Sequence, residues 1–441
     1  MTTRAFAAAQ APLNGEVHVP GSKSLSNRAL ICAALADGTS TIRGVANGND
    51  TARMIEGLRG LGAEIVVDPS DSTTVEVRRA VATKQSAAVT LQSGLAGTTS
   101  RFLTAVAALR AGETTIDGEA GLRRRPMRDL HAMLRQLGVE VTALGEPDCL
   151  PVVVRGAGLQ RGGGPREPRS VVATGGVSSQ FVSAVMMIGP RLGGISIALP
   201  DDMVSREYVQ MTAEVMRAFS ADVRIDANHV VVAAAGYSSA SYTVGGDWSS
   251  ASYPLAAGAI AGGTIRVPGV EPQTAQPEAA FIDALVAMGC SVKFVNGGVV
   301  LNRDPQRPLS GIDIDMSQMS DLVPTLAVIA ACASSDTIVR GVGFIRAKES
   351  DRLGDLAHEL RACGVEVDVR ADGLRISPRP LRPAQLDAHD DHRLAMSLAL
   401  LGLRCDGVAV REPDVVAKSW PDFWQSMASG LGIGVRDEPR R

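Results

Sequence analysis

Aromatic residues are scarce in this sequence, since Phe, Trp and Tyr together make up only 3% of its 441 residues. Hydrophobic residues still reach 45%, so the cores must be built from Ala, Val, Leu, Ile and Met. Long apolar runs are missing too, and a run such as Leu322–Ala333 is too short to cross a bilayer. The opening residues, MTTRAFAAAQ, contain no extended apolar stretch of a secretory signal. We therefore expect a cytoplasmic protein without a membrane partner.

The cysteine pattern and the charge balance exclude further classes. The six cysteines form no Cys-x-x-Cys pair, and most lie in apolar helical runs, where a thiol behaves as a small hydrophobic group. Structural zinc and disulfides are thus not expected, which fits a reducing compartment. The net charge of −3 lacks the basic excess of nucleic-acid-binding proteins. A Walker-type nucleotide site is not supported either, because GxxxxGK followed by Ser or Thr does not occur.

What the sequence does contain is a repeat that occurs six times at a spacing of roughly 70–80 residues. Each copy has a polar loop, a run of small apolar residues, a turn rich in Gly, Ser or Asp, and a β-rich segment. The copies are Gly21–Gly44, Gly94–Gly118, Gly175–Leu199, Gly246–Gly269, Gln318–Gly341 and Asp391–Arg411. The spacing is too long for a solenoid and fits a small α/β unit.

Each copy also has a second half, in which a charged loop leads into an amphipathic helix, a Gly or Ser and a short strand. Examples begin at Met54, Leu130 and Leu356. The Gly after the helix is a C-cap signal, and the alternation that follows indicates a half-buried strand. The first helices are apolar nearly all round and should be buried, whereas the second helices carry charge on one face and should be external.

The repeats also predict how the chain divides. At roughly 100–200 residues per domain, the length suggests two or three domains. Six units with buried helices indicate two halves of three units, with a boundary near Thr243–Asp247. A strand at Glu16–Val19 should pair with the second half, because the first helix opens only at Gly21. The expected domains are therefore 21–244 and a discontinuous one made of 1–20 and 245–441.

Candidate functional residues gather where the helices of these repeats begin. The backbone N–H groups at a helix start can bind an anion, so cations in several such loops indicate a site for phosphate and carboxylate ligands. The first helices offer Lys23, Ser24, Ser26, Arg28, Gly97, Thr98, Thr99, Arg101, Ser178, Ser179, Gln180, Asp321, Asp391, His392 and Arg393. The second helices add Arg125, Arg206, Lys348, Glu349, Arg352 and Lys418 at their own starts.

Each of these signals has a simpler explanation when it stands alone. GSKS at Gly21 and SSQF at Ser178 are common helix caps, and KESDR at Lys348 is typical of a solvated first helical turn, where the dipole favours Glu and Asp. The functional interpretation depends on their recurrence at equivalent places in one repeat.

Along essentially its whole length the chain resembles the enolpyruvyl transferase family. The matching segments are PGSKSLSNRA at Pro20, LAGTTSRF at Leu95, RRPM at Arg124, VSSQF at Val177, GDWSSASY at Gly246, RAKESDRL at Arg346, DDHRLAM at Asp390 and AKSWPDF at Ala417. Two features favour the branch that acts on shikimate 3-phosphate over the branch that acts on UDP-N-acetylglucosamine. The second branch has a Lys-Asn pair where this chain has Lys23–Ser24, and a Cys in the loop matching Leu122–Met127, where this chain has none.

The resemblance implies a fold and an activity. The fold is a two-domain inside-out α/β barrel of six βαβαββ repeats, three per domain, with the active site in the cleft between the domains. The activity is transfer of the enolpyruvyl group of phosphoenolpyruvate to the 5-hydroxyl of shikimate 3-phosphate, with release of phosphate, on the route to chorismate and the aromatic amino acids. It implies no metal and no cofactor, small-molecule substrates as partners, and a monomer.

The resemblance also implies roles for individual residues. Shikimate 3-phosphate would be held by Lys23, Ser24, Arg28, Ser178, Ser179, Gln180, Ser205, Asp321 and Lys348. Phosphoenolpyruvate would be held by Lys23, Gly97, Arg125, Gln180, Arg352, Arg393 and Lys418. Proton transfer would fall to Glu349 and Asp321, with Lys23 as a proton-transfer or electrostatic partner. The chain departs from many relatives at Leu95 and from some at Phe344.

Three alternatives remain open at the level of sequence. The chain could transfer an enolpyruvyl group to another alcohol, such as a nucleotide sugar. It could be an RNA 3′-phosphate cyclase, which is built from similar repeats but needs ATP and a nucleophilic His, and none of the six histidines lies in a matching motif. It could also be a binding scaffold without catalysis, although converging Lys, Arg, Glu and Asp side chains argue against that.

Overall fold

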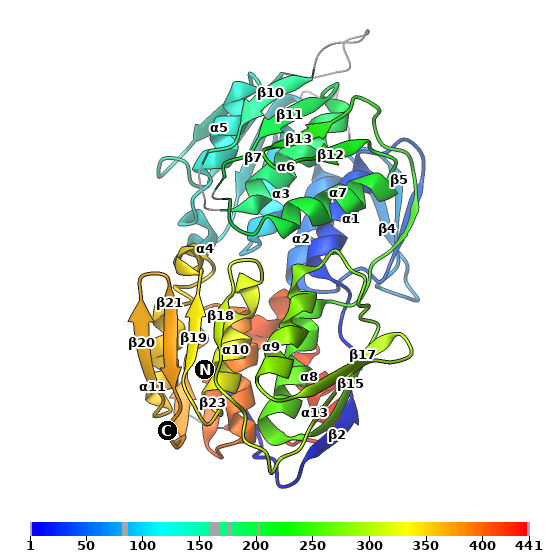
Figure 1. Cartoon of the computed structure of the whole chain (residues 1–441). Helices are drawn as coiled ribbons and strands as arrows, with labels where there is room; N and C mark the ends of the chain where they lie inside the picture. Colours follow the sequence, from blue (N-terminus) through cyan, green and yellow to red (C-terminus); the bar gives the residue numbers. More distant parts are fainter. Residues whose placement is uncertain (1, 82–86, 158–167, 175–177, 202, 439–441) are drawn as a thin grey trace. The chain divides into compact units, whose positions relative to one another are not determined.

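The computed structural model of the protein describes residues 2–81, 87–157, 168–174, 178–201 and 203–438 (Figure 1). The chain divides into two compact units. Gly21–Val244 form one, called the N-terminal unit, and Met1–Pro20 with Gly245–Arg441 form the other, called the C-terminal unit. The start of the third sequence repeat, 175–177, lies outside the described residues.

Each unit contains three sheets of four strands. In the N-terminal unit their orders are β14–β3–β5–β4 (Ser241–Thr243, Ser40–Arg43, Val75–Arg79, Glu64–Val67), β6–β7–β9–β8 (Val89–Gln92, Ala111–Asp117, Val152–Ala157, Glu140–Ala143) and β10–β11–β13–β12 (Arg169–Val172, Ile195–Ala198, His229–Val232, Val223–Ile225). In the C-terminal unit they are β2–β15–β17–β16 (Leu13–Glu16, Gly263–Pro268, Gly298–Arg303, Ser291–Phe294), β18–β19–β21–β20 (Asp313–Asp315, Thr337–Arg340, Gly373–Ser377, Glu366–Arg370) and β22–β23–β1–β24 (Ala384–Leu386, Val408–Arg411, Thr3–Phe6, Val435–Glu438).

All six sheets share one pattern of strand directions. The first two strands of each order run parallel and the remaining pairs run antiparallel, as in β18‖β19 followed by β21 and β20. A parallel pair needs a helical crossover, and an antiparallel pair needs only a turn, so the pattern is that of a βαβαββ repeat. In three of the sheets one strand, β14, β2 or β1, comes from a part of the chain far from the other three strands. The predicted six repeats, three per unit, are confirmed.

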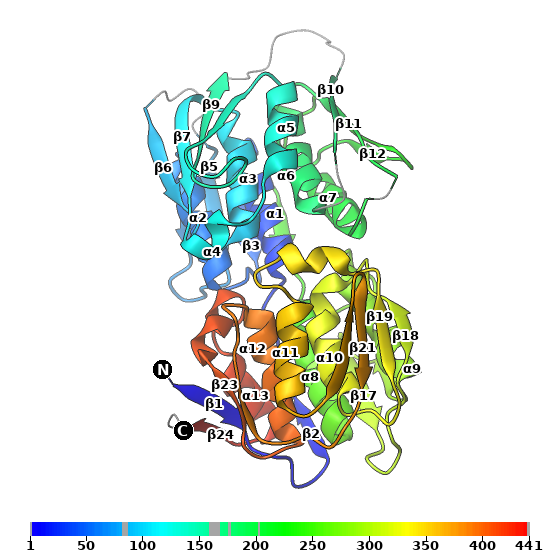
Figure 2. The same ribbon diagram turned by 90° about the vertical axis from the view of Figure 1, so that its left-hand side faces the viewer.

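The first helix of every repeat is buried nearly all round. These helices are α1 (Lys23–Ala34), α3 (Gly97–Ala107), α6 (Ser179–Ile188), α8 (Trp248–Ala261), α10 (Val323–Ala330) and α12 (His392–Ala399). In α8, for example, every residue from Trp248 to Ile260 is buried. Small residues let the surrounding strands approach: a Cβ on Gly258 would lie 2.5 Å from Ile265 Cγ1 of β15. The buried helices form the core of each unit, and α10 and α12 pack directly together (Figure 2).

The second helices bury one face and expose the other. They are α2 (Asn49–Gly60), α5 (Arg128–Gln136), α7 (Glu207–Ala218), α9 (Phe281–Ala287), α11 (Gly354–Ala362) and α13 (Phe423–Leu431). The short elements are α4 (Ala120–Arg123) and the 3₁₀ turns η1 (Gly189–Arg191), η2 (Pro277–Ala280), η3 (Ser320–Leu322), η4 (Gly343–Ala347), η5 (Leu400–Leu403) and η6 (Pro413–Lys418). No helix in the described ranges is both long and apolar enough to cross a membrane.

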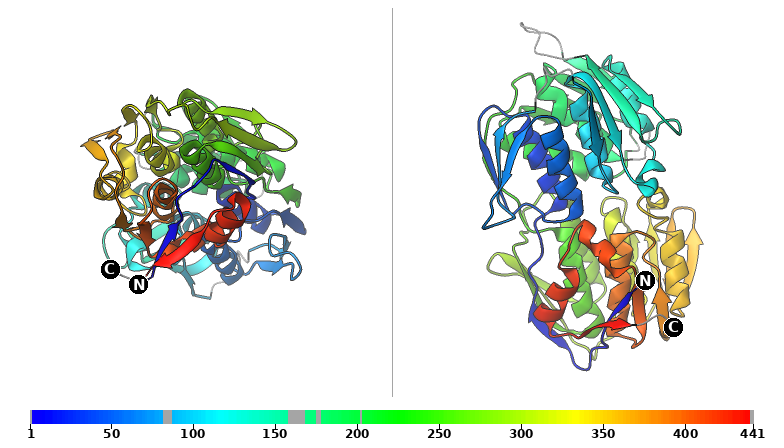
Figure 3. Two further views of the ribbon diagram at one scale, coloured as in Figure 1. Left: turned by 90° about the horizontal axis from the view of Figure 1, so that it is seen from below. Right: turned by 180° about the vertical axis from the view of Figure 1, so that it is seen from behind.

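The chain termini complete sheets of the C-terminal unit. β1 lies between β23 and β24, with Thr3 opposite Arg411 on one side and Phe6 opposite Val435 on the other. The first and last strands of the chain, β1 and β24, therefore lie side by side (Figure 3). The strand expected at Glu16–Val19 pairs with the second half as predicted, but it begins three residues earlier, at Leu13. Its parallel partner β15 starts opposite Leu13, and the last ladder bond runs from Val17 N to Arg266 O.

Candidate active site

In the C-terminal unit, one buried arginine binds three carboxylates. Arg352, which is only 1% exposed, lies between η4 and α11. Its Nη1 donates to Asp321 Oδ1 at 2.7 Å, its Nη2 to Glu349 Oε2 at 2.8 Å, and its Nε to Asp391 Oδ2 at 2.7 Å. Burial by itself would lower the pKa of Arg352, but the three carboxylates outweigh it and raise that pKa. The guanidinium is therefore fixed in charge and in place.

Asp321, in η3, is shared among further cations. Its Oδ2 accepts a hydrogen bond from Arg393 Nη2 at 2.9 Å, and its Oδ1 lies 3.7 Å from Lys348 Nζ. Burial raises the pKa of this carboxyl, but Arg393, Lys348 and Arg352 outweigh burial and hold the pKa well below its usual range. Asp321 is thus ionised at neutral pH and is a hydrogen-bond acceptor.

Glu349 connects Arg352 with a fourth cation. Its Oε1 lies 3.7 Å from the Nζ of Lys418, at the end of η6. This arginine–carboxylate cluster, comprising Asp321, Lys348, Glu349, Arg352, Asp391, Arg393 and Lys418, holds four cationic side chains and three carboxylates. Its formal charge of +1 leaves it able to bind an anion. Lys348 Nζ also lies 5.8 Å from the centre of the Phe344 ring, a cation–π distance.

Helix starts explain why these side chains meet. Asp391 is the N-cap of α12, and its Oδ1 accepts from Arg393 N at 2.9 Å, so capping and the Arg352 contact use the same carboxylate. Glu349 does not begin a helix: α11 starts only at Gly354, and Asp351 accepts from Leu353 N and Gly354 N. The interpretation of Glu349 as a first-turn dipole partner is therefore wrong, because the acidic residue in the first turn of α11 is Asp355.

The N-terminal unit holds a second cluster, at the starts of α1, α2 and α3. Lys23, the first residue of α1, places its Nζ 3.0 Å from Asp50 Oδ2. Asp50 is buried in the first turn of α2, where the helix dipole favours a carboxylate. Thr99 of α3 donates to the Asp50 carbonyl at 2.9 Å. Lys23 is thereby held in a fixed position, with Ser24 next to it, half-buried.

Gly97, the first residue of α3, lies against the guanidinium of Arg125. A Cβ at position 97 would lie 2.5 Å from Arg125 Nη1 and 2.9 Å from its Cζ. The preceding residue, Ala96, gives α3 no side-chain cap. An anion at this helix start would meet both the backbone N–H groups of α3 and the Arg125 guanidinium.

If the anion bound here is the phosphoenolpyruvate that the resemblance implies, Gly97→Ala should raise the KM for it about 10- to 100-fold, which corresponds to one lost charge-assisted hydrogen bond. The added methyl displaces Arg125, while the helix itself tolerates Ala well. Steady-state kinetics with the second substrate saturating would measure the effect. Gly145→Ala is the matched control, because the nearest atom to its Cβ is 3.9 Å away. A KM within twofold of wild type would show that Arg125 need not lie against Gly97.

The start of α6 brings Ser178, Ser179 and Gln180 together. Ser178 is the N-cap and accepts from Gln180 N at 3.3 Å. Arg101 of α3 donates to Gln180 Oε1 at 2.7 Å and to Ser178 Oγ at 3.4 Å, and its guanidinium lies 4.8 Å from the Phe181 ring centre. Arg101 thus orients the Gln180 amide so that its NH₂ group is directed away from Arg101.

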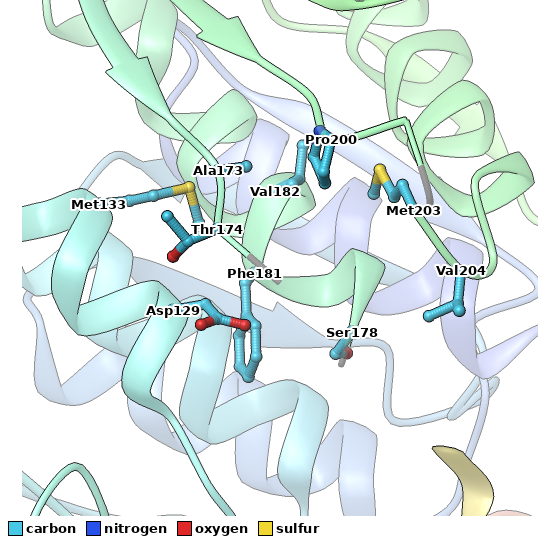
Figure 4. Close-up of a pocket in the computed structure, with 10 residues that line it drawn as sticks. All are labelled: Asp129, Met133, Ala173, Thr174, Ser178, Phe181, Val182, Pro200, Met203 and Val204. Atoms are coloured by element: carbon cyan, nitrogen blue, oxygen red, sulfur yellow. The ribbon is translucent and has the colours of Figure 1, made fainter. Parts of the chain in front are cut away.

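A small, mostly apolar pocket lies beside this helix start (Figure 4). Ser178 and Phe181 from α6 line it together with Asp129 and Met133 from α5 and Met203, before α7. Burial raises the pKa of Asp129. Ser178 is the one predicted ligand residue among the residues that line this pocket.

Two predicted ligand residues are deeply placed. Arg28 is 1% exposed, and it donates to Thr212 Oγ1 at 2.7 Å, to Ser183 Oγ at 3.3 Å and to the Ser24 carbonyl at 3.0 Å. It therefore connects α1 with α6 and α7 from below the helix start. Ser205, also buried, precedes α7 with a φ of 53° in the left-handed region.

Comparisons with known proteins identify the family of this chain. A family model described as EPSP synthase (3-phosphoshikimate 1-carboxyvinyltransferase) matches residues 7–427. A 3-phosphoshikimate 1-carboxyvinyltransferase of Methanoculleus marisnigri is 39% identical over 420 residues, which covers 94% of this chain and 96% of that protein. The chain belongs to the EPSP synthase family. An enzyme of that name from Nostoc sp. is 37% identical over 427 residues, covering 96% and 98% of the two chains.

Solved structures of related proteins superimpose on this chain over nearly its whole length. The EPSP synthase of Acinetobacter baumannii superimposes with a TM-score of 0.78 at 26% identity, over 99% of this chain and 100% of the other. The enolpyruvyl transferase NikO of Streptomyces tendae gives a TM-score of 0.79 over 100% and 99% of the two chains. At 21% identity, the second likeness shows the fold alone.

Within the EPSP synthase fold, the described structure divides the predicted residues between the two units. Asp321, Lys348, Glu349, Arg352, Arg393 and Lys418 meet in the arginine–carboxylate cluster, and Lys23, Ser24, Gly97, Arg125, Ser178, Ser179 and Gln180 lie at the helix starts of the N-terminal unit. Sequence reasoning named Asp391 and Arg101 without giving them a role, and it missed Asp50. The roles of Asp50 and Asp391 had a sequence signal, because both are acidic residues at helix starts. In the described ranges, no group of three or more His, Cys, Asp or Glu side chains is arranged to hold a metal ion.

Proposed function

We propose that this EPSP synthase family member transfers the enolpyruvyl group of phosphoenolpyruvate to the 5-hydroxyl of shikimate 3-phosphate and releases phosphate. The observation that carries the proposal is the arginine–carboxylate cluster, in which Arg352, Arg393, Lys348 and Lys418 surround Asp321 and Glu349. Cations clamp the phosphate and carboxylate of one substrate, and carboxylates beside them can move protons.

The reaction needs a proton donor, a proton acceptor and stabilisation of charge. The methylene carbon of phosphoenolpyruvate gains a proton while its C2 forms a bond to the 5-hydroxyl oxygen, which loses a proton. The C2–O bond to phosphate then breaks and the new methyl group loses a proton, so the enolpyruvyl product and free phosphate leave. Glu349 is the candidate for the carbon protons, and Asp321 for the hydroxyl proton.

Substrate binding itself would raise the proton affinity of Asp321. In the free protein, Arg393, Lys348 and Arg352 keep the pKa of Asp321 too low for an effective base. Substrate anions that bind these cations neutralise part of their field at Asp321 and so raise its proton affinity. Asp321 would thus become a better acceptor once both substrates are present.

We further propose that both units supply one active site, which the family relationship supports. The N-terminal unit contributes Lys23 with Asp50, Arg125 against Gly97, and the Ser178–Gln180 helix start. This proposal requires that Gly97→Ala in one unit and Glu349→Gln in the other impair the same reaction. We also propose that the protein is a monomer that works in the cytoplasm. Its six free cysteines fit a reducing compartment, and sedimentation equilibrium would measure the mass of the assembly.

The direct test is a phosphate-release assay in the presence of a chelator and without nucleotide. We expect release only when phosphoenolpyruvate and shikimate 3-phosphate are both present. The comparison substrate is UDP-N-acetylglucosamine, which represents transfer to a different alcohol. Robust turnover with that substrate alone would overturn the assignment, and release that depends on ATP would favour cyclase chemistry.

A further inference from the structure

The turn before α12 has an unusual backbone. His389 and Asp390 are consecutive and both lie in the left-handed region, with φ values of 51° and 56°. Such a conformation is uncommon for residues other than Gly, although Asn, Asp and His adopt it more often than most, and two such residues in a row persist where surrounding contacts impose it. The next residue is Asp391, which caps α12 and binds Arg352. Any relaxation of the turn would therefore move Asp391, and with it Arg393.

One carboxylate from a different element holds this turn. Glu359, buried on α11, accepts from Asp387 N through Oε2 at 3.0 Å and contacts His389 Nε2 through Oε1 at 2.8 Å. Asp387 Oδ1 in turn accepts from His389 N at 2.7 Å. Both oxygens of Glu359 are thus used to fix one short turn, which lies next to the arginine–carboxylate cluster in the chain.

The charges around His389 are of one sign. Glu359 and, at 3.9 Å, Asp355 face its ring from α11, and Asp387 faces it from its own turn. The hydrogen bond to Glu359 raises the pKa of His389, although burial opposes this, and Asp355 and Asp387 add to the increase. The contact with Glu359 is strongest when the imidazole is protonated.

We propose that Glu359 and His389 are positioning residues that hold the left-handed turn and thereby place Asp391 and Arg393 for binding phosphoenolpyruvate. The inference rests on the proposed function and extends it to two residues outside the cluster. Because Arg393 is the cation that this turn leads to directly, the larger effect falls on phosphoenolpyruvate, whereas shikimate 3-phosphate is reached only indirectly, through Asp321, which keeps its contact with Lys348.

The test uses two variants of the full-length protein. Glu359→Gln keeps the side-chain shape but removes the charge, and His389→Asn keeps a residue that tolerates the left-handed region but cannot reach Glu359. We expect each to raise KM for phosphoenolpyruvate about 10- to 100-fold and to change KM for shikimate 3-phosphate by less than about twofold. The control is His358→Gln, whose side chain is 77% exposed and approaches Glu359 only to 3.9 Å.

A pH profile separates positioning from simple loss of stability. In the wild type, the contact weakens as pH rises through the raised pKa of His389, whereas His389→Asn lacks that group. The KM of His389→Asn for phosphoenolpyruvate, divided by that of the wild type, should therefore be largest at low pH and fall as pH increases. Ionisation of the substrate affects both KM values equally and cancels in this ratio. Thermal melting would confirm that both variants are folded.

Two results would overturn the inference. One is an unchanged KM for phosphoenolpyruvate in His389→Asn, the milder variant, together with a flat ratio across pH. The other is an equal rise of both KM values with a lowered melting temperature, which would assign the pair a purely structural role. If the wild type releases no phosphate from the two substrates, the proposed function itself is wrong and this inference falls with it.

Discussion

Replacing Glu349 with Gln should lower kcat about 10²–10⁴-fold, the usual contribution of a general acid or base. Gln keeps the shape and still accepts a hydrogen bond from Arg352, which retains Asp321 and Asp391 as partners. The fold and the binding of shikimate 3-phosphate should therefore be preserved while the proton-transfer group is lost. Stopped-flow or steady-state phosphate release measures kcat, and calorimetric titration measures the binding.

The matched control is Glu366→Gln in the same unit. Glu366 pairs with Arg379 on the surface, its side chain is 64% exposed, and its loss should leave kcat unchanged. A kcat for Glu349→Gln within about threefold of wild type would fall well below the expected range. In that case Asp321 and Lys23 must carry the proton transfers, and Glu349 would act only as a partner of Arg352.

The repeat architecture could be predicted from sequence because its signals are local. Helices that are apolar all round, such as α8, must be buried, and a Gly after an amphipathic helix marks where a strand can begin. The place of β1 between β23 and β24 has no such signal, because the partners are separated by more than 400 residues in the chain. The same limit applies to the start of β2, which its partner β15 determines.

Prediction of the candidate site from sequence has the same limit. Motifs indicated which residues matter, but not which atoms they touch. That Arg352 binds three carboxylates depends on tertiary packing that brings η3, the segment before α11 and the start of α12 together. The burial of Arg28 likewise depends on its contacts with α6 and α7. Glu349 shows the error that follows: the spacing in KESDR predicted a first helical turn, whereas the helix begins only at Gly354, after Asp351 has accepted hydrogen bonds from the N–H groups of Leu353 and Gly354.

Arg352→Met should destabilise the protein by about 3–5 kcal/mol, because it removes one partner of a buried ion network. Asp391, whose side chain is fully buried, would lose its contact with the guanidinium and retain the hydrogen bonds from Ser350 Oγ and the backbone N–H of Arg393. Asp321 would lose its closest cation. For a unit of 150–250 residues, each kcal/mol lowers the melting temperature by about 2–4 °C. Differential scanning calorimetry should thus detect a decrease of roughly 6–20 °C.

The control for this change is Arg340→Met. Arg340 makes an ion pair of nearly the same length, 2.8 Å to Asp313, but its side chain is 59% exposed. Water already solvates both groups of such a pair, so its loss should cost less than about 1 kcal/mol. Equal melting temperatures for the two variants would show that the buried carboxylates find other partners, or become protonated, when Arg352 is absent.

The pH dependence of the Arg352→Met variant distinguishes these two explanations. The cations around Asp321 lower its pKa in the folded state, so its ionisation stabilises the fold above the unfolded value of about 3.9 and that stability is lost as pH falls. Without Arg352, the folded pKa is lowered less, and Asp321 contributes less at neutral pH. If the carboxylates become protonated in the folded variant, their folded pKa lies above the unfolded value, so the variant regains stability and its deficit should shrink as pH is lowered from 7 to 4, a range in which the wild type keeps the contribution of ionised Asp321. If they find new cationic partners, urea midpoints measured across this range should differ from wild type by a constant amount.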